Sequence, residues 1–358
     1  MFAHIANRTL IFLIGVLALS AAVFAQNTPR ETLLILSKQD HTVAIVDPTT
    51  LKVITKIPVG NDPHEVIASS DGNTAYVSNY GGGAYNTLTV VDVALQTPLN
   101  TIDLGPLRGP HGLDFAGGKV WFTAEAAKAI GSYDPTSSKV DWILGTGQDR
   151  THMIYVAPDL QRIVTTNVSS GTVSIIERSG ARAAGGLPPS SENPQQGTAT
   201  GPPPEPPHAD WTETVVKVGN GSEGFDVSRD SKEIWVANAK DGTISIIDFA
   251  QKKVTQTLQA NVRGANRLKF TPDGNLVFVS SLSGSNVVVF DAATRRETKH
   301  IPVGHGAAGI QMQPDGSRAF VACTPDNYVV VIDLKSFQVT AHVDAGHQPD
   351  GMAWAGHR

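Results

Sequence analysis

Histidines and carboxylates stand at equivalent places of a repeated pattern in this chain. Aspartate turns and the motifs Gly-Pro-His-Gly and Gln-Pro-Asp-Gly align one residue from each of seven copies: His64, His111, His152, Glu223, Asn266, Ala308 and Asp350. Imidazole and carboxylate groups are lone-pair donors that suit Zn, Cu or Fe. We therefore predict one bound divalent transition metal. Its predicted ligands are His64, His111, His152 and Glu223.

The two acids of this set are also the candidates for catalysis. A carboxylate beside a metal can act as a general base on water, and Glu223 and Asp350 are predicted in this role. Asn266, with Asp350, would orient water or a substrate. The alternative is that these polar residues line a water-filled space and bond only to backbone and water.

A second set of polar residues lies a few positions earlier in the copies. Its members are Asn61, Arg108, Arg150, Arg263, His305 and His347. Three arginines at equivalent places would attract an anionic ligand, unless they are simply solvated surface charges. Tyr80 and Tyr85 flank a Gly-rich loop and are predicted to cover or stack on that ligand.

The elements that position these residues are short strands. The segment Asp241-Gly242-Thr243-Ile244-Ser245-Ile246-Ile247-Asp248 is a turn followed by β-branched residues and a closing acid. Similar segments end at Asp47, Asp92, Asp134, Glu177, Asp291 and Asp333. Apart from one longer gap, the spacing is about 42 to 45 residues, with four strand-like runs per copy, which is typical of propellers.

The repeat predicts an all-β fold, a seven-bladed β-propeller of four-stranded blades. The chain begins a copy at its second run, 32–37, and ends just after a first run, 350–354. The last run should therefore supply the innermost strand of the first blade and close the ring. Seven inner strands that begin at one axis would bring the aligned polar residues together at the mouth of a central channel.

Residues 32–354 resemble the YVTN-type β-propeller repeat of surface-layer and periplasmic bacterial proteins. The resemblance rests on Val59-Gly60, Ser70-Asp71-Gly72, Tyr76-Val77-Ser78-Asn79 and Thr89-Val90-Val91-Asp92. It implies a seven-bladed propeller and is nearly silent on activity. The third blade, with Gly109-Pro110-His111-Gly112-Leu113 and Trp121-Phe122-Thr123, resembles virginiamycin B lyase and gluconolactonase-like propellers, and no catalytic residue is carried across from them.

The N-terminus has the layout of a secretory signal peptide over residues 1–25. Arg8 precedes an apolar run from Leu10 to Val23, and Val23-Phe24-Ala25 places small residues before Gln26. A membrane anchor is the competing interpretation, but the run is shorter than the ~20 residues that a spanning helix needs. We expect a periplasmic or secreted protein with no transmembrane segment after cleavage. Residues 26–358 would form a single propeller domain.

One spacing is longer than the others because the fourth blade carries an insert. Between residues 180 and 210 the chain is rich in Pro, Gly, Ser and Gln. This composition cannot build a core and predicts a flexible loop between the third and fourth strands. The alternative is a polyproline segment that docks a protein partner.

The composition excludes some functions and leaves several open. The net charge of −5 makes nucleic acid an unexpected partner, and the single cysteine, Cys323, cannot form an intramolecular disulfide. We expect Cys323 to be a buried packing residue. The leading hypothesis is an exported propeller that binds a small molecule or protein at the channel mouth. The rivals are a metal-dependent hydrolase or lyase, lactonase-like in type, and a passive cell-surface scaffold.

Overall fold

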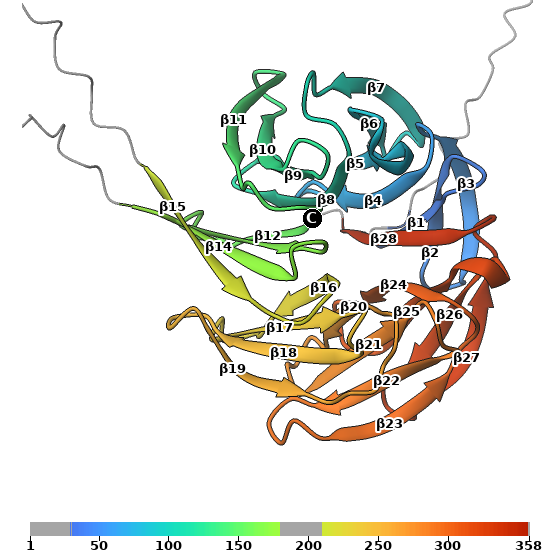
Figure 1. Ribbon diagram of the computed structural model, residues 1–358. Coiled ribbons are helices and arrows are strands. Elements are labelled where there is room, and N and C mark those ends of the chain that lie inside the picture. Colours follow the sequence, from blue (N-terminus) through green and yellow to red (C-terminus); the bar gives the residue numbers. More distant parts are fainter. Residues whose placement is uncertain (1–28, 30, 180–209, 357–358) are drawn as a thin grey trace, which may run out of the picture.

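The computed structural model describes residues 29, 31–179 and 210–356, and these form a ring of seven antiparallel sheets (Figure 1). Each sheet has four strands, and the sheets are arranged like blades around a central axis. The predicted all-β, seven-bladed propeller is confirmed. Two short 3₁₀ helices, Gly81–Gly83 and Thr324–Asp326, lie in loops that follow second strands.

The strands follow one order in every blade, from the axis outward. The innermost strands are β4 (Pro63–Ala68), β8 (Pro110–Ala116), β12 (Thr151–Val156), β16 (Ser222–Val227), β20 (Ala265–Phe270), β24 (Ala307–Met312) and β28 (Pro349–Gly356). The second strands are β1 (Glu31–Ser37), β5 (Thr74–Asn79), β9 (Lys119–Ala124), β13 (Arg162–Asn167), β17 (Glu233–Asn238), β21 (Leu276–Ser281) and β25 (Arg318–Cys323).

The two outer positions are just as regular. The third strands are β2 (Thr42–Asp47), β6 (Thr87–Asp92), β10 (Ala129–Asp134), β14 (Thr172–Arg178), β18 (Thr243–Asp248), β22 (Asn286–Asp291) and β26 (Tyr328–Asp333). The outermost strands are β3 (Lys52–Pro58), β7 (Thr97–Asp103), β11 (Lys139–Gly145), β15 (Trp211–Lys217), β19 (Lys253–Leu258), β23 (Glu297–Pro302) and β27 (Gln338–Val343).

The ring closes where the sequence predicts. Strand β28 pairs antiparallel with β1, so that Leu33 lies opposite Trp354 and Leu34 opposite Ala353. The first blade is therefore built from both ends of the described chain, in the order β28-β1-β2-β3. This pairing covers the edge of β1 that faces the axis, and β28 takes the innermost position of the blade.

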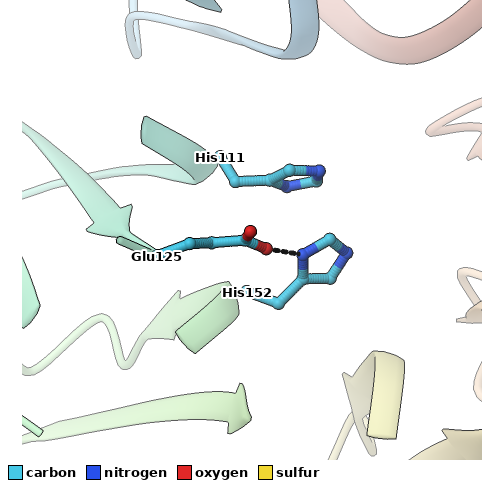
Figure 2. A group of neighbouring side chains, drawn as sticks. All are labelled: His111, Glu125 and His152. Atoms are coloured by element: carbon cyan, nitrogen blue, oxygen red, sulfur yellow. Dashed lines mark hydrogen bonds and ion pairs between the residues drawn. The ribbon is translucent and has the colours of Figure 1, made fainter. Parts of the chain in front are cut away.

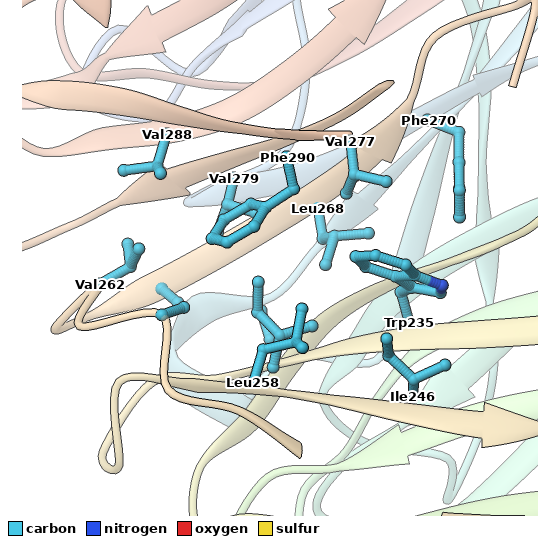
Figure 3. Close-up of a cluster of buried hydrophobic side chains, with 14 residues drawn as sticks. Trp235, Ile246, Leu258, Val262, Leu268, Phe270, Val277, Val279, Val288 and Phe290 are labelled. Atoms are coloured by element: carbon cyan, nitrogen blue, oxygen red, sulfur yellow. The ribbon is translucent and has the colours of Figure 1, made fainter. Parts of the chain in front are cut away.

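Apolar side chains fill the space between neighbouring blades. Figure 3 shows one such cluster, in which Trp235 of β17 is fully buried against Leu268 and Phe270 of the next blade. Complete burial of one large apolar side chain stabilises a fold by roughly 1.5–3 kcal/mol. The second-strand aromatic residues therefore pack one blade on the next, as predicted. Cys323 is likewise buried in such a cluster, among Val330 and Ile310.

Two sequence predictions fall on residues outside the described part of the chain. The signal peptide covers residues 1–25, and most of the insert lies within 180–209. The insert joins β14 to β15, the third and fourth strands of one blade, and these two strands pair along their whole length. The signal peptide and the flexibility of the insert therefore stay predictions.

The innermost strands share an irregularity that controls the channel. In β12, Thr151 pairs with Asn167 and Ile154 with Thr165, so His152 and Met153 lie in a β-bulge. The other innermost strands shift register at the same place. A bulge redirects side chains, and here it lets the residue after the aligned one reach the channel where that residue has a side chain, as in Glu65, Met153 and Arg267.

A hydroxyl on the second strand holds this bulge in place. Thr123 of β9 donates to the carbonyl oxygen of His152 in the next blade at 2.7 Å, and it accepts from the backbone N–H of Gly112 at 2.9 Å. Thr166 donates in the same way to the carbonyl oxygen of Glu223, at 2.6 Å. One side chain thus fixes two backbone groups, one in each of two neighbouring blades.

We predict that Thr123→Val lowers the free energy of unfolding by about 1–3 kcal/mol, because the isosteric change leaves two buried backbone groups without a partner. Urea denaturation measures the loss. Thr123→Ser keeps the hydroxyl and serves as the control, with at most a small change. Equal stability of the valine variant and the unmodified protein would show that the bridge has no energetic role.

Candidate functional site

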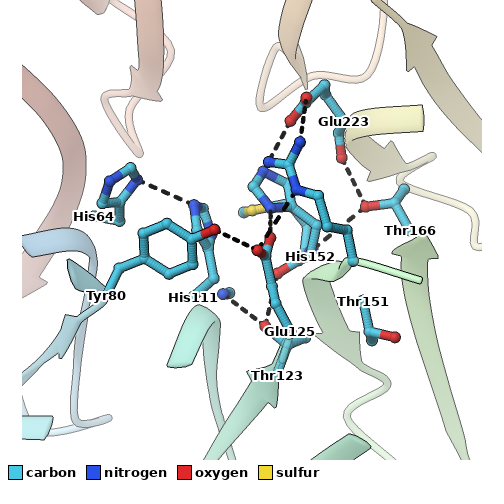
Figure 4. A network of polar contacts seen from close by, with 12 residues as sticks. His64, Tyr80, His111, Thr123, Glu125, Thr151, His152, Thr166 and Glu223 are labelled. Atoms are coloured by element: carbon cyan, nitrogen blue, oxygen red, sulfur yellow. Dashed lines mark hydrogen bonds and ion pairs between the residues drawn. The ribbon is translucent and has the colours of Figure 1, made fainter. Parts of the chain in front are cut away.

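The structure brings three of the aligned histidines together at the mouth of the channel. The ring centroids of His64 and His111 are 4.8 Å apart, and those of His111 and His152 are 3.8 Å apart (Figure 4). These residues come from β4, β8 and β12, the innermost strands of three consecutive blades. With Tyr80, Glu125, Arg150 and Glu223 they form what we call the mouth cluster.

A chain of hydrogen bonds determines which nitrogens of His64 and His111 carry hydrogen. His64 Nε2 lies 3.2 Å from an oxygen of Asp62, and His64 Nδ1 lies 3.1 Å from His111 Nε2. The hydrogen bond from His64 holds the pKa of Asp62 below its ordinary value, so Asp62 is an acceptor. His64 therefore donates to Asp62 from Nε2, and in the tautomer in which His64 accepts at Nδ1, His111 donates from Nε2.

This arrangement leaves His111 Nδ1 as a bare lone pair. The atom is buried and has no hydrogen-bond partner among the described residues. Burial, followed by the neighbouring charges of His152 and His64, holds the pKa of His111 well below its ordinary value. The imidazole is therefore neutral, and its free nitrogen is suited to a metal ion or to a ligand that donates a hydrogen bond.

His152 is held between two carboxylates. Its Nδ1 bonds to Glu125, and its Nε2 lies 2.9 Å from Glu223. Both contacts need a donor, so the imidazole is doubly protonated. Burial alone would lower the pKa of His152, but the charges and hydrogen bonds of Glu223 and Glu125 outweigh it and raise that pKa above the ordinary value.

Glu125 belongs to the cluster, but the sequence reasoning did not find it. It follows the last residue of β9, is buried, and accepts a hydrogen bond from the Tyr80 hydroxyl at 2.6 Å. Lys38, Tyr80 and Glu125 each come directly after a second strand, and all three reach the channel. A comparison of this one repeat position across the blades is the signal that could have found them.

Three residues of the cluster could hold a metal ion together. Each of His111, Glu125 and His152 offers one ligand atom, and these atoms lie within 4.8 Å of one another (Figure 2). The set differs from the predicted ligands. Glu125 is the carboxylate of this group, where Glu223 was predicted. Glu223 instead bonds to the other nitrogen of His152, Nε2. His64 is not part of the group and bonds to His111 Nε2. The metal itself stays a prediction.

The other two aligned polar residues lie away from this group. Asp350 is buried, 2.9 Å from Lys38 Nζ and 3.7 Å from His64 Nδ1. Burial would raise its pKa, but Lys38, His64 and Arg267 lower it below the ordinary value. Asn266 is also buried. Asp350 therefore contacts the cluster only through His64. It does not contact Glu125 or His152, so the structure gives its predicted catalytic role no direct support.

Only some residues of the wider set reach the cluster. Arg150 lies 3.5 Å from Glu125 and 3.7 Å from Glu223, and its side chain remains partly exposed. The predicted residues that lie exposed on the surrounding surface are Arg108, Arg263, Tyr85, His305 and His347. The last two bond to aspartates of neighbouring loops, Asp326 and Asp40. Of the predicted anion-steering arginines, the structure brings only Arg150 to the carboxylates.

A buried ion pair crosses the channel below the histidines. Glu65 of β4 and Arg267 of β20 come from blades on different sides of the ring, and their side chains form an ion pair. Each residue directly follows an aligned residue, His64 or Asn266. The bulge turns both positions inward, so a second layer of side chains fills the channel here.

Comparison with known proteins supports the fold. No protein-family model matches the chain, and no curated protein matches it. The resemblance to YVTN-type repeats therefore has no family model behind it. Solved structures match over nearly the whole chain. A functionally unknown protein from Desulfotomaculum acetoxidans has a TM-score of 0.70 and 14% identity, covering 90% of this chain and 98% of its own.

Two further structures add to this picture. A protein titled a putative 6-phosphogluconolactonase, from Bacteroides fragilis, has a TM-score of 0.67 and 15% identity, covering 91% of this chain and 98% of its own. Hydrazine synthase from Kuenenia stuttgartiensis has a TM-score of 0.62 and 15% identity, and the match covers 82% of this chain and 91% of the hydrazine synthase chain. Identities this low show a shared fold and leave the activity open.

We predict that Glu223→Gln destabilises the protein by about 1–3 kcal/mol at pH 7, and that the difference from the unmodified protein vanishes in acid. Burial raises the pKa of Glu223, but the charge and hydrogen bond of His152 outweigh it and lower that pKa from 4.5 to about 2. A carboxyl group whose pKa is lower in the folded protein stabilises the fold at any pH above its pKa in the unfolded chain. This stabilisation is lost as the pH falls through the pKa in the folded protein. Urea denaturation of both proteins from pH 7 to pH 2 measures the difference in the free energy of unfolding. A difference that does not change with pH would contradict the prediction.

Proposed function

We propose that this chain holds a divalent transition metal at the channel mouth and hydrolyses or cleaves a small ester-like or lactone-like molecule there. The observation that carries the proposal is the buried Nδ1 atom of His111, which has no hydrogen-bond partner among the described residues and lies beside Glu125 and His152. An unpartnered buried polar atom costs free energy, so a missing ligand is a physical reason for it.

The donor set fits a catalytic site of Zn, Cu or Fe. Two imidazoles and a carboxylate are the usual protein ligands of such ions, and catalytic sites keep a further position open for substrate. His152 must give up its Nδ1 proton to become a ligand, since only neutral imidazole binds a metal. Tyr80 holds the second oxygen of Glu125, which leaves one oxygen of Glu125 directed at His152.

The residues around the group have separate roles in this proposal. A bound metal would polarise the carbonyl of an ester or lactone. Glu223 is the candidate general base, because loss of the His152 proton removes the charge that lowers the Glu223 pKa most. Arg150 is partly exposed at the opening and would bind an anionic group of the substrate.

The structural neighbours suggest which substrates to test first. Two of them are titled putative 6-phosphogluconolactonases, from Bacteroides fragilis and Bacteroides uniformis. Both share only about 15% of their residues with this chain, so they supply a substrate class for a first screen. Lactones of sugar acids, with and without a phosphate group, belong in that screen.

The second candidate is ligand binding without catalysis. In the metal-free protein His152 already bonds to both carboxylates, and Arg150 balances their charge. An anion that contacts Arg150 and donates a hydrogen bond to His111 would be bound and not altered. A passive scaffold, in contrast, has no reason to keep several buried ionisable groups, since burial disfavours their charged forms.

We predict that protein purified without a histidine tag binds one transition metal per chain, and that His111→Ala abolishes binding and lactone or ester hydrolysis together. Metal analysis and a hydrolysis screen measure the two effects. His300→Ala is the control, because His300 is an exposed histidine paired with Glu297 on an outer strand. A protein without metal, or with full metal content after His111→Ala, contradicts the proposed site.

We also propose that the chain works outside the cytoplasm, in the periplasm or after secretion. The support is the pattern of residues 1–25. Separately, none of the helices in the described part of the chain could span a bilayer. We expect the mature protein to begin at Gln26, because the small residues Val23 and Ala25 precede it. Intact-mass measurement on exported protein tests this, and a full-length mass would contradict it.

The Pro-rich insert offers a route to a protein partner, which we keep as a separate hypothesis. The strands on either side of it, β14 and β15, meet it at Arg178 and Trp211, at the opposite end from the pair of Asn167 and Thr172 near the mouth. Deletion of residues 181–208 should leave metal binding intact and weaken partner capture. Unchanged capture would remove the insert from consideration.

A further inference from the structure

A second cavity lies in the channel beyond the Glu65–Arg267 pair. It has a volume of about 280 Å³ and is lined by all seven innermost strands. Side chains along each strand alternate between the channel and the packing between blades. The residues two positions after the aligned set, such as Leu113 and Leu268, pack between blades, and some of them, such as Phe225 and Met352, also line the cavity. The residues three positions after the aligned set face the cavity.

A ring of polar side chains occupies that third position. Its members are Asp114, Tyr155, Asp226, Lys269 and Gln311, each from a different innermost strand. At about 3.3 Å per residue, this ring lies roughly 10 Å further along the channel than the histidines. The Glu65–Arg267 pair lies between the two levels and separates the cavity from the mouth cluster.

The acids of the cavity outnumber its bases. Glu65 pairs with Arg267, and Lys269 Nζ lies 3.7 Å from Asp226. Asp114 has no ion pair among the described residues, and its oxygens accept the backbone N–H groups of Val156 at 2.7 Å and Phe115 at 2.8 Å. One carboxylate therefore remains without a cation beside it.

Apolar side chains also lie in the wall of this cavity, between its polar and charged groups. Met153, Phe225 and Met352 also line the cavity. Burial raises the pKa of Asp114, although the two backbone N–H groups and the more distant Lys269 oppose that effect. A ligand that brings a positive charge would compensate the carboxylate, and an apolar ligand body would match the apolar part of the lining.

We propose that this cavity binds a small organic amine, with its ammonium group on Asp114 and its apolar body against Met153, Phe225 and Met352. Pockets for small molecules combine apolar walls with fixed polar groups that orient the ligand, and this cavity offers both. The volume admits a molecule of roughly benzylamine size. The inference is independent of the proposed function, since it needs neither the metal nor the mouth cluster.

The experiment compares charged and uncharged probes on metal-free protein. Benzylamine and butylamine are titrated by calorimetry, with benzyl alcohol and butanol as uncharged counterparts. We expect the amines to bind at least tenfold more tightly than the alcohols, and Asp114→Asn to remove this preference. Asn keeps one acceptor for the tether to Val156, and circular dichroism verifies that the variant folds.

Two more variants make the outcome decisive. Gln311→Trp fills the cavity from the opposite wall and should abolish binding. His111→Ala removes the mouth cluster and should leave amine affinity unchanged, which separates this inference from the proposed metal site. Amine binding that survives Asp114→Asn and Gln311→Trp, equal binding of alcohols, or no binding at about 10 mM amine would each overturn the proposal.

Discussion

The hydrogen bond between a second-strand hydroxyl and the next blade's innermost strand is the contact on which the site depends. Thr123 bonds the His152 carbonyl, Thr166 the Glu223 carbonyl and Ser280 the Ala308 carbonyl. Each bond lies at a bulge of the innermost strand. The contact therefore does two things at once: it ties blade to blade, and it fixes the backbone from which a functional side chain projects.

Electrostatics decides how these side chains can coexist. Buried charges are tolerated only in pairs, and the channel contains several: His152 with two glutamates, Asp350 with Lys38, and Glu65 with Arg267. Against this background the exceptions are informative. Among the described residues, His111 Nδ1 at the mouth has no hydrogen-bond partner, and Asp114 in the lower cavity has no ion pair.

Much of the architecture could be predicted from the repeat, because period and strand alternation follow from local residue types. The ring closure and the convergence of His64, His111 and His152 followed from register alone. Glu125 and Lys38 were missed because they follow second strands, whose loops reach the axis only in the folded ring. His305 and His347 were predicted in the outer set that binds a ligand, but both are exposed and bond to aspartates of neighbouring loops.

By itself, then, the sequence determined the blade, the number of copies and the kind of residue that each innermost strand presents, since these depend on short-range patterns. The tertiary structure alone decided the contacts that the repeat register does not predict. Glu65 and Arg267 are 202 residues apart, and no local pattern links them. Their contact, and the division of one channel into a histidine-lined mouth and a lower cavity, exist only because the ring closes and the bulges let Glu65 and Arg267 reach the channel.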